Sequence, residues 1–195
     1  MQPTSGFTLI ELMVTLAVAA ILAFFAVPGF QEFIKTNSLS AQANAFLADL
    51  HLARAEAIKR KGRVTMCKSS TLTSCATDGG WEQGWIIFAD QADIGWGAGD
   101  ASRFIVRTNG PTPGMITIRG NQNVKHLVYF LSTGEAPATA GTLIICDDRI
   151  KEFSTSSKEE REKTRAVVIS PSGRLKIIKG SDSTLSSSIT SCTPG

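Results

Sequence analysis

The sequence Gly-Phe-Thr-Leu-Ile-Glu-Leu at residues 6–12 opens an apolar run that extends to Phe30 and contains one charged residue, Glu11. From Leu12 to Gln31, twenty consecutive residues are uncharged. At a helical rise of ~1.5 Å per residue, such a stretch matches a bilayer core of ~30 Å. The sequence therefore predicts a membrane-spanning helix that carries a carboxylate near its start.

Glu11 requires an explanation, because a carboxylate in hydrocarbon costs about 2.5 to 3.5 kcal/mol. A cleaved secretory signal is disfavoured, since residues 1–6 contain no Lys or Arg. A plain signal anchor explains the length of the run but not the acid. Cleavage between Gly6 and Phe7 would leave an α-amine one helical turn from Glu11, within reach of its charge. An acid favoured by the positive end of a helix dipole is the simpler alternative.

Residues 6–11 resemble the processing site of type IV pilins and type II secretion pseudopilins. The resemblance implies that residues 1–6 are a prepilin leader peptide, which lacks the basic residue usual in that family. It also implies that a prepilin peptidase cleaves between Gly6 and Phe7, and that the new N-terminus of Phe7 is methylated. By the same resemblance, Glu11 is the assembly residue that aligns the chain with neighbouring subunits.

The apolar segment is expected to continue into an amphipathic helix. Its apolar residues recur at spacings of three and four and so share one face: Leu39, Ala43, Phe46, Leu50, Ala53 and Ala57. Polar residues fall elsewhere on the helix: Gln42, Asp49, Arg54, Glu56 and Lys59. Residues 7–31 are then the transmembrane or filament-core half and residues 32–62 the amphipathic half, with a kink or local unwinding expected at Pro28 and Gly29.

After Gly62 the pattern changes to short segments rich in Val, Ile and Phe, separated by Gly, Pro, Asn or Ser. The predicted strands are 63–68, 84–90, 103–107, 115–119, 126–131, 142–147, 165–170 and 174–179. These segments predict a β-rich globular head over residues 63–180, built from one or two antiparallel sheets. The fold class is α+β, and the resemblance implies a type IV pilin-like arrangement, with the long helix packed on the sheet.

Four cysteines fit the oxidising compartment that the inferred topology gives the head. They allow three pairings, of which Cys67 with Cys75 and Cys146 with Cys192 is favoured. The second pair would tether a Ser/Thr-rich tail over residues 181–195. Free buried cysteines are the simpler alternative. A metal site is disfavoured, because the sequence has no Cys-x-x-Cys and its two histidines are far apart.

Four further segments resemble the GspH/FimT group of minor pilins and pseudopilins, in order and in approximate spacing. They are residues 53–58, 64–67, 84–90 and 167–174. The likeness covers most of the chain, but the charged insertion from Arg149 to Arg165 is not part of it. Some members of this group prime or cap type IV pili, some serve the secretion pseudopilus, and one branch binds DNA during natural transformation.

The DNA-binding branch is associated with a Gly-Arg-x-Arg motif, for which this chain has Gly-Arg-Leu-Lys at residues 173–176. Lysine in place of the second arginine keeps the charge but loses bidentate geometry. Residues 165–179 contain no acid and four basic residues that could contact DNA phosphates: Arg165, Arg174, Lys176 and Lys179. They could equally be the solvated face of a protected edge strand. A second basic group, at Lys59, Arg60, Lys61 and Arg63, either joins that face or favours the helix C-terminus.

The sequence lacks the common catalytic and nucleotide-binding motifs, so we expect neither an enzyme nor a cofactor. Asp90, Asp93 and Asp100 could surround calcium, but their spacing misses the EF-hand pattern, and no metal site is predicted. The three tryptophans, Trp81, Trp85 and Trp96, could form a binding platform, although aromatic residues near strand ends more often complete a core.

The function expected from these observations is that of a minor type IV pilin, supporting pilus biogenesis from a place near the pilus tip. The alternatives are a DNA-binding minor pilin for DNA uptake and a type II secretion minor pseudopilin. The resemblance implies as partners other major and minor pilins, prepilin peptidase and the inner-membrane assembly platform, with sequence-independent binding of double-stranded DNA as a further option. It implies a single-pass protein of the bacterial inner membrane with a periplasmic head, and later a pilus on the cell surface.

Overall fold

The computed structural model describes Gly6 and residues 8–89, 104–150, 153, 155–183, 185 and 192, with the side chains of residues 25–29 excepted. The chain forms two compact units, an N-terminal unit, Met1–Ser38, and a C-terminal unit, Leu39–Gly195. The predicted Asp90, Asp93, Trp96 and Asp100 lie outside the described residues.

The N-terminal unit contains the first part of helix α1, which runs from Leu9 to Arg60. The helix is continuous through residues 28 and 29, where the sequence predicted a kink or local unwinding. Within the described part of the chain, no helix has an apolar stretch of the length and hydropathy needed to cross a membrane. Phe7 and the side chains of residues 25–29, which belong to the predicted span, lie outside the described residues.

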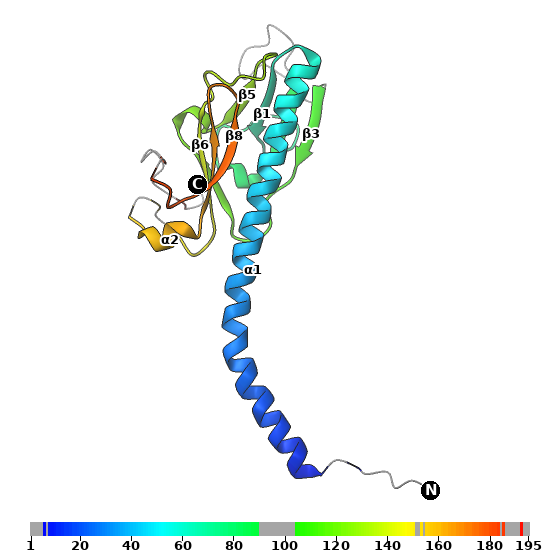
Figure 1. The fold of residues 1–195 in the computed structure, drawn as a ribbon. Coiled ribbons are helices and arrows are strands. Elements are labelled where there is room, and N and C mark those ends of the chain that lie inside the picture. Colours follow the sequence, from blue (N-terminus) through cyan, green and yellow to red (C-terminus); the bar gives the residue numbers. More distant parts are fainter. Residues whose placement is uncertain are drawn as a thin grey trace. The chain divides into compact units, whose positions relative to one another are not determined.

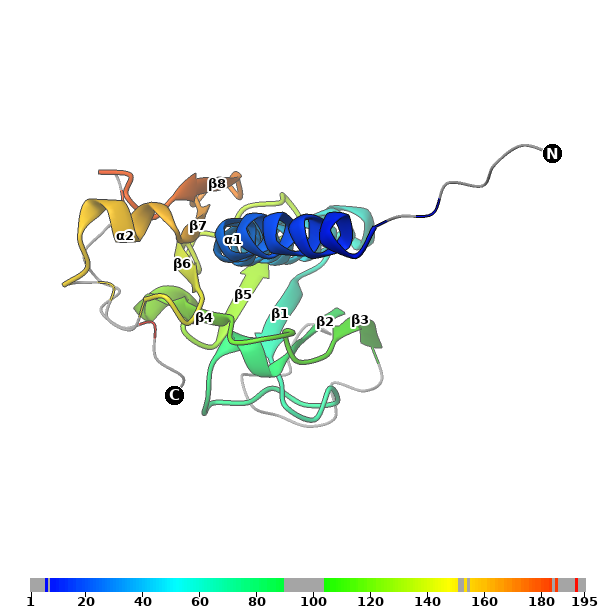
Figure 2. The ribbon, with the colours of Figure 1, turned by 90° about the horizontal axis from the view of Figure 1, so that it is seen from below.

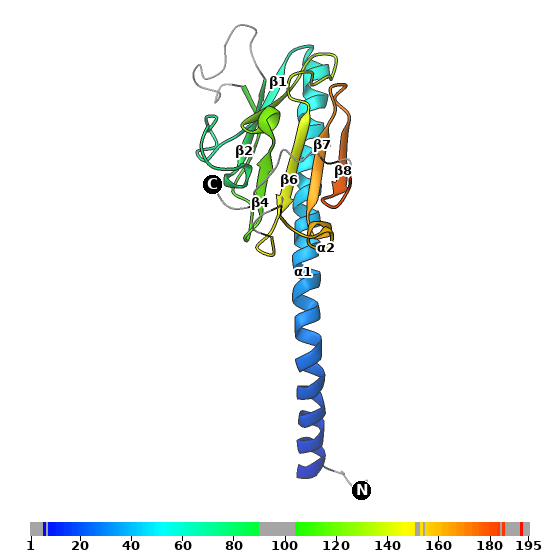
Figure 3. The ribbon, with the colours of Figure 1, turned by 90° about the vertical axis from the view of Figure 1, so that its left-hand side faces the viewer.

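The C-terminal unit combines the second part of α1 with eight antiparallel strands in two sheets (Figures 1 and 3). The first sheet has the order β3-β2-β1-β5, from Ile105–Asn109, Trp85–Ala89, Val64–Lys68 and Leu127–Phe130. The second has the order β4-β6-β7-β8, from Thr117–Gly120, Gly141–Cys146, Arg165–Ile169 and Leu175–Lys179. The predicted α+β fold is confirmed, and each predicted strand overlaps an observed one.

Helix α1 ends where the sequence predicts, through a recognisable C-cap. The amide of Gly62 donates to the carbonyl of Ala57 at 3.2 Å, and the amide of Lys61 donates to that of Ile58 at 3.3 Å. Lys61 has φ of 53°, the left-handed conformation that follows a helix in the Schellman motif. The chain then reverses direction directly into β1.

The predicted apolar stripe of α1 forms the centre of the main core. All six of its residues, from Leu39 to Ala57, are at most 1 % exposed. Seen along the helix axis, the C-terminal half of α1 lies in the angle between the two sheets (Figure 2). The ring of Phe46 packs edge-to-face with the rings of Trp81 and Trp85, and the distances between ring centroids are 5.5 Å and 5.0 Å. These two tryptophans therefore belong to the core and not to a surface platform.

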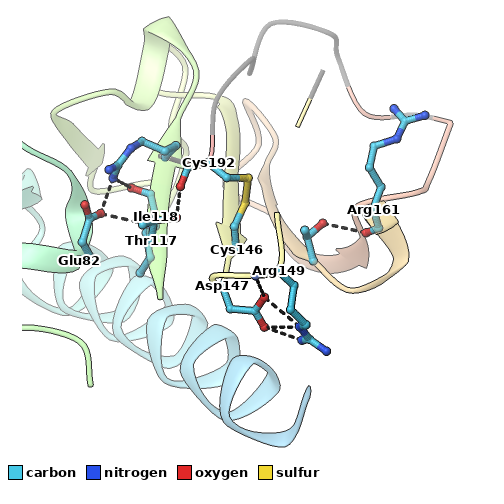
Figure 4. The surroundings of a disulfide bond; sticks show 10 residues. Glu82, Thr117, Ile118, Cys146, Asp147, Arg149, Arg161 and Cys192 are labelled. Carbon is cyan, nitrogen blue, oxygen red and sulfur yellow. Dashed lines mark hydrogen bonds and ion pairs between the residues drawn. A yellow bond between two sulfur atoms is a disulfide. The ribbon is translucent and has the colours of Figure 1, made fainter. Parts of the chain in front are cut away.

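The short 3-10 helix η1, Trp81–Gln83, connects the two sheets. The indole nitrogen of Trp81 donates to the carbonyl of Val124 at 3.0 Å, which lies in the 3-10 helix η3, Gln122–Val124. The carboxylate of Glu82 accepts from the backbone amide of Ile118 at 3.1 Å and pairs with Arg119 (Figure 4). Both partners of Glu82 belong to β4, so η1 fixes the edge of the second sheet.

The second sheet has an apolar layer on each face. Residues of one parity, such as Leu143, Ile145 and Val167, pack with α1 in the main core. Strand residues that point to the other face form a second cluster together with residues from outside the strands. We call it the outer cluster: Ile144, Cys146, Ile150, Phe153, Ala166, Ile178 and Cys192. Ile150 and Phe153 come from the start of the charged insertion, so this insertion covers the outer face of the sheet.

Cys192 closes the outer cluster through a disulfide to Cys146 at the end of β6 (Figure 4). Its carbonyl also accepts a hydrogen bond of 2.7 Å from the Thr117 hydroxyl on β4. Cys67 pairs with Cys75, which closes a short loop after β1. These are the two pairs favoured from the sequence, and no cysteine is free.

The rest of the insertion is polar and locally stabilised. Asp147 and Arg149 form a largely buried ion pair directly after β6. A short helix, α2, spans Lys158–Glu162 and begins with a capping box in which Ser157 and Glu160 satisfy each other's backbone amides. The Arg161 guanidinium lies 5.8 Å from the ring centroid of Phe153, which connects α2 to the outer cluster.

Two basic residues lie near the start of the Cys67–Cys75 loop, the buried Lys68 and the partly exposed His126. The ammonium of Lys68 is buried and donates to the carbonyl of Gly79 at 2.6 Å. Burial lowers the pKa of Lys68. Burial also lowers the pKa of His126 from its ordinary 6.5, and the charges of Lys68 and Lys125 lower it further. His126 is thus neutral under conditions in which an exposed histidine would begin to take up a proton.

We predict that protonation of His126 weakens the fold under acidic conditions. Because the pKa of His126 is lower in the folded than in the unfolded chain, the unfolded chain binds the proton more readily below 6.5. The free energy of unfolding should therefore fall between about pH 7 and about pH 5, and His126→Gln should reduce that fall. Urea unfolding of both proteins across this range, in detergent micelles, provides the measurement. Equal pH dependence in the variant and the parent protein would contradict the assignment.

Candidate functional site

The predicted processing site lies just before α1. Gly6 is exposed and precedes the helix, and nothing lies within 4 Å of where a Cβ would project from it. Phe7, its partner in the predicted cleavage, lies outside the described residues. Gly6 is therefore accessible in the described structure, as a peptidase substrate requires.

Thr8 and Glu11 form the start of the helix. The carbonyl of Thr8 accepts from the amide of Leu12 at 3.2 Å, and the Thr8 hydroxyl accepts from the amide of Glu11 at 3.3 Å. Thr8 is thus the N-cap, and Glu11 occupies the third helical position, where a negative charge is favoured by the helix dipole. The Glu11 side chain is exposed and directed away from the helix axis, so it is accessible to a neighbouring chain.

The side chains around Glu11 are mostly apolar, with Thr8 and Thr15 as polar neighbours. Leu9, Ile10, Leu12 and Met13 are between 56 % and 77 % exposed, and at ~100° per residue they cover the side of the helix opposite Glu11. Val14 and Val18, which are 57 % and 50 % exposed, lie on the same side as Glu11. Large exposed apolar side chains continue along this unit to Phe33 and Ile34. A helix that is apolar over most of its surface requires an apolar cover, from lipid or from other helices.

The four basic residues predicted to contact DNA do not form a single patch. Arg165 pairs in register with Lys179, at the end of β8 near α2 and on the α1 side of the sheet. Lys176 has the parity of Ile178 and so lies on the opposite face. Arg174 precedes β8 at its other end, about 17 Å from Lys179 along an extended strand.

Arg165 also differs from the other three in its surroundings. It is only partly exposed, and its guanidinium donates to the carbonyl of Thr164 at 2.9 Å, to that of Glu162 at 3.1 Å and to the hydroxyl of Ser40 at 3.3 Å. These contacts fasten the start of β7 to α1. Arg165 has a structural role, whereas Arg174, Lys176 and Lys179 are exposed.

Gly173 of the predicted motif occupies a tight turn between β7 and β8. Its φ is 73°, and a Cβ at this position would lie 1.8 Å from the carbonyl oxygen of Gly134. That same oxygen accepts a hydrogen bond of 2.9 Å from Nε of Arg54 on α1. The amide of Ala136 also donates to the carbonyl of Pro171 at 2.9 Å. The glycine is therefore required for the β7–β8 turn to dock on the loop after β5 and on α1.

This docking brings Arg174 to the end of the molecule where α1 terminates. The turn of Gly134 lies against Ile58, in the last turns of the helix. Three exposed basic residues follow or adjoin this point, Lys61, Arg63 and Arg174, and we call them the helix-end basic group. The guanidinium of Arg63 lies 5.4 Å from the ring centroid of Tyr129. One exposed acid, Glu135, lies in the neighbouring loop.

Lys59 and Arg60, predicted as part of the same basic cluster, share one carboxylate. Lys59 forms an ion pair of 3.3 Å with Glu56, and Arg60 forms one of 2.6 Å with the same carboxylate. The hydrogen bond from Arg60 holds the pKa of Glu56 below its ordinary value. The shared carboxylate therefore offsets one of these two positive charges and stabilises the helix end.

A buried carboxylate, Asp49, was not recognised from the sequence as important. It lies on α1 beside the apolar stripe and is 1 % exposed. Its Oδ2 accepts from the Trp85 indole at 2.8 Å and from the Asn109 amide at 3.1 Å, and its Oδ1 lies 3.0 Å from Nε of Arg107. These contacts attach α1 to β2 and β3. In the sequence, burial of Asp49 is indicated only by its position three residues after Phe46, which puts both side chains on the same side of the helix.

We predict that Gly173→Ala destabilises the protein more than Gly114→Ala. Both glycines have positive φ, of 73° and 75°, so both substitutions carry the conformational cost of about 1 to 2 kcal/mol. Only Gly173 faces a backbone oxygen, because nothing lies within 4 Å of the Cβ position at Gly114. Thermal unfolding of both variants provides the comparison. Equal losses of stability would show that the contact with Gly134 is unimportant.

Comparison with known proteins agrees with this architecture. The family described as "Type II transport protein GspH" matches residues 42–173, and the prokaryotic N-terminal methylation motif matches residues 1–27. The fold is similar to that of the type IV minor pilin FimU of Pseudomonas aeruginosa PAO1, in two crystal forms. The first has 21 % identity, a TM-score of 0.54 and coverage of 83 % of this chain and 99 % of FimU.

The second FimU crystal form has 20 % identity and a TM-score of 0.51, and the match covers 80 % of this chain and 100 % of FimU. The minor pseudopilin EpsH of the Vibrio cholerae type 2 secretion system has 16 % identity, a TM-score of 0.46 and coverage of 73 % and 97 %. The FimU matches show a shared fold, and the two sequence matches together cover most of the chain. The chain therefore belongs to the GspH family and carries a prepilin-type N-terminal methylation motif.

Proposed function

We propose that this protein is a minor type IV pilin that is processed between Gly6 and Phe7 and assembles, through α1, into a pilus near its tip. The observation that supports this most directly is the exposed apolar surface of α1 around Glu11. Lipid covers such a surface before assembly, and the helices of other pilins cover it in a filament. The role proposed for the head is structural.

Glu11 has a defined task in this proposal. As an exposed acid in the first turn of an apolar helix, it is costly unless a cation neutralises it. Cleavage after Gly6 creates such a cation, the α-amine of Phe7, on each subunit. The amine of one chain and the carboxylate of the next would then set the axial position of an incoming subunit.

We predict that Glu11→Ala leaves the protein in the membrane fraction but removes it from sheared pili. The apolar surface that favours the membrane is unchanged, whereas the charge that positions the subunit is lost. Immunoblots of membranes and of sheared pili provide the measurement, and Glu32→Ala, which removes an acid further along α1, is the control. Normal amounts of Glu11→Ala in pili would refute this role. Absence of the parent protein from sheared pili, with retention in the envelope, would favour a secretion pseudopilus.

DNA binding is a second candidate function, favoured by one structural observation. The docking of Gly173 places Arg174 at the same end of the molecule as Lys61 and Arg63. Three exposed cations at one end suit contact with phosphates, which is independent of sequence. The helix-end basic group therefore replaces the four residues of the β7–β8 hairpin as the proposed contact surface, with Arg174 common to both.

We predict that full-length protein in micelles binds duplex DNA in a salt-sensitive manner through this group. Arg174→Ala and Lys61→Ala should each weaken binding and lower the slope of log K against log salt by about 1. Lys179→Ala, at the opposite end of β8, and Lys158→Ala, on α2, should bind like the parent protein. Titrations monitored by fluorescence anisotropy at low and moderate salt test this. Binding that is absent, or that is unchanged in Arg174→Ala and Lys61→Ala, would exclude DNA as a ligand of this group.

A further inference from the structure

The end of strand β3 places a reactive dipeptide beside a buried charge. Asn109 is the last residue of β3 and is followed by Gly110, and it is the one asparagine of the sequence that precedes a glycine. In such a pair the backbone nitrogen of the glycine can attack the side-chain amide carbon, because glycine carries no side chain to obstruct the approach. Both residues are partly exposed, so solvent reaches them.

The surroundings of Gly110 leave room for this reaction. Nothing lies within 4 Å of where a Cβ would project from Gly110, and its φ is outside the left-handed region. The chain leaves the sheet at this residue and continues into a segment that contains Pro111 and Pro113. The side of Gly110 on which a Cβ would project is therefore open.

The amide of Asn109 has a specific structural task. It donates to Oδ2 of Asp49 at 3.1 Å, and this oxygen also accepts from the Trp85 indole. Asp49 is 1 % exposed, and a buried carboxylate depends on its hydrogen-bond donors. Asn109 thus supplies one of the contacts that hold α1 against the first sheet.

We propose that Asn109 is a site of spontaneous deamidation, and that its modification weakens the attachment of α1 to the first sheet. The Gly110 nitrogen bonds to the Asn109 side-chain carbon, and the amide nitrogen leaves as ammonia with the proton given up by Gly110. Water then opens the resulting succinimide at either carbonyl to give aspartate or isoaspartate. Solvent water is the one co-reactant, and no oxidation or reduction takes place.

The product reverses the interaction with Asp49. A donor amide becomes a carboxylate, so the hydrogen bond is lost and two like charges meet at a site with little solvent. Isoaspartate also adds a methylene group to the backbone at the end of β3. The Trp85 indole and the Arg107 guanidinium still contact Asp49, but the contact between Asp49 and residue 109 becomes repulsive.

The modification itself is tested by incubating full-length protein in micelles at mildly alkaline pH, followed by peptide mapping with mass spectrometry and enzymatic isoaspartate labelling. Asn109 should convert progressively in the parent protein. Gly110→Ala, which the open space around Gly110 accommodates, should retain the amide and the parental unfolding transition. An unmodified Asn109 in the parent protein, or equal conversion in Gly110→Ala, would overturn the proposal.

The structural consequence is tested with Asn109→Asp, which reproduces one product, and Asn109→Ala, which removes the donor without adding a charge. At neutral pH the thermal unfolding midpoint should be lower for Asn109→Asp than for Asn109→Ala. The difference should disappear under acidic conditions, in which the added carboxyl group is protonated. If Asn109→Asp does not fold, the deamidated fraction of the parent protein, separated by ion exchange, replaces it. A midpoint no lower than that of Asn109→Ala would contradict the repulsion with Asp49.

Discussion

The burial of the apolar stripe of α1 in the angle between two sheets is the interaction on which the C-terminal unit depends. Each sheet contributes one apolar face to the same helix. Phe46 is central to this contact, because its ring touches Trp81 and Trp85, which lie on η1 and β2. The polar contacts of Asp49 add direction to this packing by fixing the rotation of the helix against the first sheet.

Local patterns in the sequence predicted the long helix and the strands, but they could not predict which strands pair or which side chains meet across the fold. The apolar spacing from Leu39 to Ala57 and the period of the eight strands follow from local geometry, and the structure confirms both. The strand orders could not be predicted, because β5 pairs with β1 and β4 with β6 across intervening segments. The burial of Asp49 was missed for the same reason, since its donors come from β2 and β3.

The basic residues illustrate what a one-dimensional pattern omits. Alternation along an extended strand already separates Lys176 from Lys179, so that part of the division was available from the sequence. Tertiary contacts decide the rest. Arg165 donates a hydrogen bond to Ser40 on α1, and Gly173 docks on Gly134, which places Arg174 at the end where α1 terminates. The proposed functions therefore rest on different parts of the molecule. Assembly rests on the N-terminal unit, which the motif at residues 6–11 indicates directly, whereas DNA contact rests on a surface that forms only when the chain folds.

The two faces of the second sheet depend on different lengths of chain. The main core is complete once Ile177 of β8 is in place, whereas the outer cluster also needs Cys192. A chain that crosses a membrane from its N-terminus presents these parts in that order. In the interval, Ile150 and Phe153 are available to cover Ile144 and Ile178, but the outer cluster still lacks Cys192. Oxidation of Cys146 with Cys192 then comes after both sheets are formed, so the outer cluster is the last part of the C-terminal unit to be completed.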